Sequence, residues 1–166
     1  MQFVTQMSWD APMDRVLNMI TSSEYVARKT ELMGYVSFDI QSCVTEGQVF
    51  TAKVRVTDMP SIELPAFAQR FVRQDQPIVM DQTDIWNKDT GCGELVLENR
   101  SVSVVKIRAG MALSELDGIT TNTLNWDVSC SVPLVGGKLA AMIADDIREK
   151  AARTEMVSRQ VLKELF

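Results

Sequence analysis

The sequence contains no histidine, and this limits the chemistry that its other side chains can perform. Catalytic triads and Cys–His pairs need an imidazole, and so do the common zinc motifs. Any catalysis would therefore depend on carboxylates, lysine, tyrosine or a bound cofactor. The three cysteines, Cys43, Cys92 and Cys130, are odd in number and widely spaced. We expect them to be buried free thiols, with no disulfide and no metal.

Two short motifs have the composition of a chemical site but are better explained as structure. Gly91-Cys92-Gly93 lacks the third glycine, the following helix and the Lys-Ser/Thr pair of a phosphate-binding loop, so it favours a β-turn. Asp145 and Asp146 are adjacent on an expected helix, where neighbouring side chains diverge by about 100° and cannot form a facing acid–base pair. We therefore expect no cofactor.

Gln82 and Asp84 are the candidates for polar groups inside the protein. They share one face of an expected strand, and they would orient a ligand if that face points inward. The alternation of this strand is weak, so the opposite arrangement, with Val79 and Ile85 inward, fits equally well. An inward Asp84 would be desolvated and thus a candidate acid or base, although few other reactive groups are available to assist it.

The hydrophobic pattern predicts an α+β protein that opens with a strand and two short helices. Asp10 and Pro12 mark the start of the first helix, and the second runs from about Glu24 to Met33, with Gly34 as a left-handed cap. From Tyr35 onward the hydrophobic period changes from 3.6 to 2, which indicates a sheet. The expected strands span residues 2–9, 36–45, 50–57, 78–86, 94–99, 102–113 and 123–132.

The C-terminal segment predicts one long helix. An apolar stripe continues from Val135 to Leu165, and about 30 helical residues would span roughly 45 Å. That length is sufficient to cross a six- or seven-stranded sheet. No βαβ alternation and no internal repeat is present, so we expect one domain over residues 1–166.

This element order resembles the START-like, or SRPBCC, superfamily, particularly through Asp10-Ala11-Pro12 and Gly136-Gly137-Lys138-Leu139. The resemblance implies a helix-grip fold, in which a curved antiparallel sheet wraps around the C-terminal helix and encloses a cavity for lipids, sterols or polyketides. Three segments look closer to an uncharacterised bacterial branch of the superfamily. They are Leu64-Pro65-Ala66-Phe67-Ala68-Gln69-Arg70-Phe71, Gln82-Thr83-Asp84-Ile85-Trp86 and Ser131-Val132-Pro133-Leu134-Val135-Gly136-Gly137-Lys138-Leu139.

We therefore predict a ligand cavity between the sheet and the last helix. Gln82 and Asp84 would orient the ligand, and Leu64, Phe67 and Phe71 would gate its mouth or form the inner face of a rim helix. Methionines suit irregular apolar ligands, although they also fill ordinary cores. The residues expected to line the cavity are Phe38, Phe50, Val54, Met80, Trp86, Met111, Leu124, Trp126, Leu139, Met142 and Ile143.

The composition excludes several partners. A net charge of −5 and a pI near 4.8, without a basic cluster, argue against nucleic acid. No apolar run approaches the roughly 20 residues of a membrane span, and the N-terminal residues lack a signal-peptide pattern, so we expect a cytoplasmic protein. The leading hypothesis is binding of a small hydrophobic molecule. The alternatives are a cofactor-free cyclase or dehydratase, and an interaction domain with a solid core; the oligomeric state stays open.

Overall fold

The computed structural model of the protein describes the chain except for residues 61–62, 64–65, 71–74 and 101–103. It contains a seven-stranded antiparallel sheet with the strand order β1-β7-β6-β5-β4-β3-β2. The strands are β1 (Gln2–Trp9), β2 (Ser37–Glu46), β3 (Val49–Asp58), β4 (Ile78–Asn87), β5 (Cys92–Asn99), β6 (Val105–Leu116) and β7 (Ile119–Cys130). The helices are α1 (Met13–Ile20), α2 (Ser23–Leu32), the 3-10 helix η1 (Ala68–Arg70) and α3 (Gly136–Leu165).

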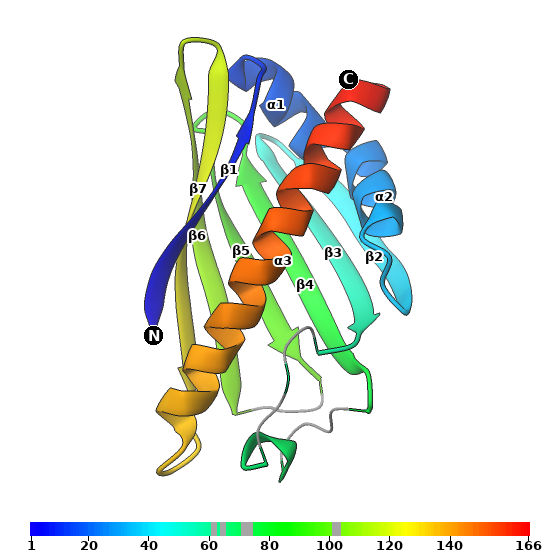
Figure 1. Cartoon of the computed structure of the whole chain (residues 1–166). Helices are drawn as coiled ribbons and strands as arrows, with labels where there is room; N and C mark the ends of the chain where they lie inside the picture. The colour runs from blue at the N-terminus through cyan, green and yellow to red at the C-terminus, as the bar shows by residue number, and fades with distance from the viewer. Residues whose placement is uncertain (61–62, 64–65, 71–74, 101–103) are drawn as a thin grey trace.

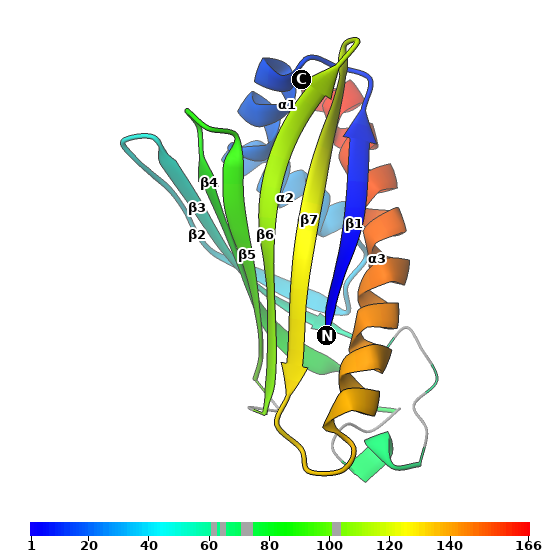
Figure 2. The ribbon, with the colours of Figure 1, turned by 90° about the vertical axis from the view of Figure 1, so that its left-hand side faces the viewer.

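The long helix α3 crosses the concave face of the sheet diagonally (Figure 1), and α1 and α2 lie on this same side of the sheet (Figure 2). α3 packs against β1 and β7 at one side of the sheet and against α2 at the other. The predicted helix-grip α+β fold is therefore confirmed. α3 contains 30 residues, the length that its apolar stripe indicates.

The first two helices form for the reasons visible in their sequence. Val16, Met19 and Ile20 give α1 a buried face. The Ser22 hydroxyl accepts a hydrogen bond from the Tyr25 backbone N–H and caps the start of α2. After α2, Gly34 has a φ of 67°, the left-handed conformation that ends many helices.

A buried hydrogen-bond network anchors α3 to the rest of the core. The Ser158 hydroxyl accepts a bond from Trp9 Nε1 at 3.2 Å and shares another with the Tyr25 hydroxyl at 2.8 Å. Ser158 is fully buried, with Val157 and Val161 beside it. One side chain of α3 thus joins β1 to α2, and the three elements pack as one unit.

The hairpin of β6 and β7 is longer than the hydrophobic pattern indicated. Its strands meet at a two-residue turn in which Asp117 and Gly118 both have positive φ values, 52° and 76°. This geometry is that of a type I′ turn, for which Asp-Gly is a favoured sequence. The sequence pattern missed the extension because the inward-facing residues of β7 next to the turn, Thr120 and Asn122, are polar, whereas the alternation is recognised from apolar residues.

Candidate functional site

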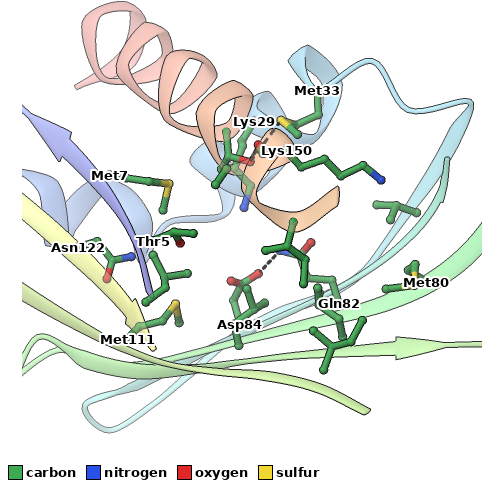
Figure 3. A pocket seen from close by; sticks show the side chains of 18 of the residues that line it. Thr5, Met7, Lys29, Met33, Met80, Gln82, Asp84, Met111, Asn122 and Lys150 are labelled. Carbon is green, nitrogen blue, oxygen red and sulfur yellow. Dashed lines mark hydrogen bonds between the residues drawn. The ribbon is translucent and has the colours of Figure 1, made fainter. Parts of the chain in front are cut away.

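A cavity of about 200 Å³ lies between the concave face of the sheet and the helices α2 and α3. Its walls are mostly apolar and come from six of the strands as well as both helices (Figure 3). All three tryptophans of the chain, Trp9, Trp86 and Trp126, contribute to the walls. The molecule therefore has a hydrophobic interior that its own described side chains do not fill.

Most of the residues predicted to line the cavity do so. Seven apolar side chains of that set are in its walls: Phe50, Met80, Trp86, Met111, Leu124, Trp126 and Ile143. Four others, Phe38, Val54, Leu139 and Met142, lie outside these walls. Val54 and Leu139 are buried in the surrounding core.

The positions of Phe38 and Met142 have simple geometric reasons. Phe38 pairs with Val56 and so shares the inner face of the sheet, but β2 is the edge strand and leaves this ring 45% exposed. Met142 precedes Ile143 on α3, and because neighbouring helical side chains diverge by about 100°, only one of them can point into the cavity. Ile143 takes that position.

The proposed gate falls largely outside the described residues, which do not include Leu64 and Phe71. Phe67 is described and is partly buried next to the start of α3, where Lys138 Nζ lies 5.9 Å from the centroid of its ring. This contact is a cation–π interaction between the loop before β4 and α3.

Both predicted polar residues, Gln82 and Asp84, point into the cavity. Asp84 pairs with Ala52 on β3 and Leu95 on β5, both buried, which places its face of β4 inward. The Gln82 amide donates a hydrogen bond from Nε2 to Asp84 Oδ2 at 2.7 Å. The ambiguity in the β4 pattern is thus resolved by the two neighbouring strands, which fix the register.

Lys29 is a cavity residue that the sequence analysis missed. It enters from α2, on the side opposite Asp84, and the two charged groups point toward one another (Figure 3). Lys29 Nζ lies 5.3 Å from the centroid of the Tyr25 ring. The four-residue spacing of Tyr25, Lys29 and Met33, the last of which caps the C-terminal end of α2, was the signal that all three share one stripe.

The environment of Lys29 favours its charged form. Burial by itself lowers the pKa of Lys29, but Tyr25, Asp84 and Tyr35 oppose that effect, and the resulting pKa is above its ordinary value. Lys29 and Asp84 are nevertheless further apart than the 4.0 Å of a direct ion pair. In the described part of the chain, the Lys29 ammonium has neither an ion-pair partner nor a hydrogen-bond acceptor.

Asn122 on β7 is the second polar residue that sequence reasoning missed. Its side chain is 2% exposed, and its Oδ1 atom lacks a hydrogen-bond partner among the described residues. It lies in the cavity wall beside Met7 and Met111 (Figure 3). A buried acceptor without a partner is unusual in native proteins and indicates a place where another molecule can donate a hydrogen bond.

A third polar group in the wall is satisfied internally. Lys150 on α3 forms ion pairs with Asp58 at 3.1 Å and with Asp146 at 3.2 Å. Burial lowers the pKa of Lys150, but the two carboxylates outweigh it and the net direction is upward. Burial also raises the pKa of Tyr35 next to this cluster. The cluster joins α3 to the end of β3, so among the described charges of the wall only Lys29 and Asp84 lack an ion-pair partner.

Two further features are absent from the described residues. No three Cys, Asp or Glu side chains there gather closely enough to hold a metal ion. No helix in the same residues combines the length and the apolar character needed to cross a membrane.

Comparison with solved structures identifies the fold as START-like. The protein TTHA0849 from Thermus thermophilus superposes with a TM-score of 0.68 at 10% identity, covering 99% of this chain and 98% of that one. The Zhui aromatase/cyclase from Streptomyces sp. R1128 gives 0.66 at 10% identity, with 98% and 93% covered. A START superfamily protein from Mycobacterium smegmatis gives 0.60 at 12% identity, with 96% and 98% covered.

Comparison of the sequence gives a family without an assigned activity. A family model described as "Protein of unknown function (DUF2505)" matches residues 5–162. No curated protein matches the chain significantly.

Proposed function

The chain belongs to the DUF2505 family, and we propose that it binds a small hydrophobic molecule in the cavity between its sheet and α3. The observation that carries the proposal is the cavity itself. Protein interiors pack as densely as organic crystals, so a 200 Å³ space with largely apolar walls is unusual in a domain that only needs a core. This argues against an interaction domain with a filled interior.

The volume limits the size of the ligand. An engineered apolar cavity of about 150 Å³ holds one benzene molecule, whereas pockets for drug-sized ligands have roughly 300–1,000 Å³. A cavity of about 200 Å³ therefore favours a molecule of one or two rings, or a short branched chain. A sterol or a multi-ring polyketide would require the cavity to expand. The similar fold of an aromatase/cyclase supports an aromatic ligand among the small candidates.

The test uses the protein's own fluorescence and stability. Because all three tryptophans line the cavity, a ligand should change their emission. A ligand at 100 times its Kd should add about 2.7 kcal/mol of stability, which corresponds to a melting temperature higher by roughly 5–10 °C. Mass spectrometry of the organic extract from purified protein would identify a bound natural ligand.

A pair of neighbouring substitutions provides the control. Ile143→Trp places a larger side chain in the cavity, so the ligand-induced rise in melting temperature should disappear. Met142→Trp alters the preceding residue of α3, which lies outside the walls, and should preserve that rise. If no apolar compound changes the fluorescence or the melting temperature, and Ile143→Trp costs the roughly 1–3 kcal/mol typical of an overpacked core, the binding proposal is wrong.

A second candidate function, a cofactor-free enzyme, is favoured by the convergence of Lys29 and Asp84. Asp84 would accept a proton from the carbon next to a ligand carbonyl, and the Lys29 ammonium would stabilise the resulting enolate oxygen. Exchange of that proton for deuterium in D2O, measured by NMR on a small ketone such as 2-tetralone, tests this reaction. In Asp84→Asn the exchange rate should fall to that of buffer alone. If the unmodified protein also exchanges the proton no faster than buffer alone, the enzyme hypothesis is wrong.

A further inference from the structure

We propose that the cavity selects a small aromatic molecule carrying two hydroxyl groups, one bound between Lys29 and Asp84 and the other hydrogen-bonded to Asn122. This inference rests on the proposed ligand-binding function and specifies the chemistry of the ligand. Its basis is that the apolar walls enclose polar atoms that the described part of the protein leaves without partners.

A hydroxyl group is chemically complementary to Lys29 and Asp84 together. An ammonium only donates hydrogen bonds and an ionised carboxylate only accepts them, while a hydroxyl can accept from the first and donate to the second. Gln82 already binds Asp84 Oδ2 and holds the carboxylate in place. A ligand hydroxyl would thus connect two charged groups that are too far apart to pair directly, in a site where unpaired charge is costly.

The same two charges disfavour ionic ligand groups. A ligand carboxylate attracted to Lys29 would lie next to the Asp84 carboxylate, and a ligand amine attracted to Asp84 would lie next to the Lys29 ammonium. Each arrangement adds a repulsion between like charges at close range in a poorly solvated site. A neutral hydroxyl gains from both groups without that repulsion.

Asn122 supplies an independent argument for a hydroxyl. Its Oδ1 atom is buried without a partner among the described residues, and it lies in the wall rather than behind it. A carboxamide can rotate to present either its oxygen or its NH2 group, and a hydroxyl, which donates and accepts, satisfies both orientations. Asn122 lies on β7 near β1, whereas Asp84 is on β4, so the two polar positions are on different parts of the sheet.

The walls between these positions favour an aromatic body. Met7 and Met111 flank Asn122 (Figure 3), while Trp126 lies on β7 with Asn122 and Trp86 lies on β4 with Asp84. Thioether sulfurs and indole rings make favourable contacts with the edges and faces of aromatic rings. Together with the volume of about 200 Å³, these contacts favour a fused two-ring molecule.

The experiment compares three compounds that differ only in hydroxyl groups. Naphthalene, 2-naphthol and 2,6-dihydroxynaphthalene are titrated into the purified protein by isothermal titration calorimetry. The first hydroxyl should lower Kd by about tenfold, because hydrogen bonds to charged groups contribute more than neutral ones. The second should lower it by a further factor of roughly three to ten.

Variants show which residue is responsible for each increase in affinity. Lys29→Met should remove the difference in affinity between 2-naphthol and naphthalene. Asn122→Leu should remove the difference in affinity between 2,6-dihydroxynaphthalene and 2-naphthol, and it should preserve the difference between 2-naphthol and naphthalene. Arg28→Met is the matched control, since Arg28 precedes Lys29 on α2 but lies outside the cavity walls and pairs with Glu31 and Glu164, and it should leave both differences in affinity unchanged.

The outcomes separate this inference from the proposed function. If naphthalene binds as tightly as the hydroxylated compounds, the hydroxyl selection is wrong while hydrophobic binding stands. If none of the three compounds binds, both proposals fail for aromatic ligands. The comparison among compounds on the unmodified protein is decisive even if the Lys29 variant does not fold, because it needs no substitution.

Discussion

Asn122→Leu should stabilise the ligand-free protein while weakening its binding of hydroxylated ligands. The Asn122 side chain is 2% exposed and its Oδ1 atom is unpaired within the described structure, so folding removes this oxygen from water without replacing the lost hydrogen bond. Leucine has the same branched arrangement of side-chain atoms as asparagine, with methyl groups in place of the polar ones. The substitution therefore removes a desolvation cost and adds apolar contacts with Met7 and its neighbours in the wall.

The expected magnitude follows from the cost of an unsatisfied buried group, about 1–3 kcal/mol. For a chain of this length, the melting temperature should rise by roughly 2–12 °C. Thr120→Val is the matched control, two residues earlier on the same face of β7. Thr120 is fully buried and donates a hydrogen bond to the Ala11 carbonyl oxygen at 2.7 Å, so its loss should cost about 1–3 kcal/mol.

The assay is urea unfolding followed by circular dichroism, on protein refolded from denaturant so that any copurified ligand is removed. The two variants should shift the unfolding midpoint in opposite directions at an unchanged m-value. If Asn122→Leu destabilises the protein as much as Thr120→Val, the Asn122 amide has a partner in the folded protein. The reasoning that leads from the unpaired oxygen to a ligand hydroxyl would then be refuted.

Two further predictions concern the anchoring of α3 and the outer face of the sheet. Ser158→Ala should lower the free energy of unfolding by about 2–4 kcal/mol, because it leaves the buried Trp9 N–H and Tyr25 hydroxyl groups unpaired. Adding Tyr25→Phe should cause no further loss, since it removes the unpaired Tyr25 hydroxyl. If thermal unfolding shows that the losses from the two substitutions add, the hydrogen-bond network is contradicted. Hydrogen bonds from Arg55 hold the pKa of the Asp81 carboxyl below its ordinary value. The stability from this pair is present at neutral pH and is lost as the pH falls below about 4. The free energy of unfolding of Arg55→Met should therefore be closest to that of the wild type in acid. If the difference in free energy between the two proteins stays constant from about pH 2 to pH 7, this prediction is wrong.

The sequence determined the elements of the fold because each element has its own hydrophobic period. The alternation in β7 and the 30-residue stripe of α3 are local patterns, and local patterns indicate which residues share a face. The order of the elements and the motifs at Asp10 and Gly136 then indicated a helix-grip arrangement, which the structure confirms. The absence of histidine likewise excludes catalytic triads, Cys–His pairs and histidine-based zinc motifs.

The tertiary structure decided which faces of the helices and strands pack together. The hydrophobic period of an element shows which residues share a face, but it does not show what lies opposite that face or, where the period is weak, which face is inward. The register of β3, β4 and β5 turned Asp84 inward where its own strand was ambiguous, and the packing of α2 placed Lys29 across the cavity from it. Likewise, Asn122 precedes the strand predicted at residues 123–132, and only the structure shows that it is buried on β7 and that its oxygen lacks a partner among the described residues. A hydrogen bond depends on the positions of groups distant in the sequence. The apolar character of the cavity could thus be predicted from the sequence, whereas the polar groups that would select its ligand come together only through packing.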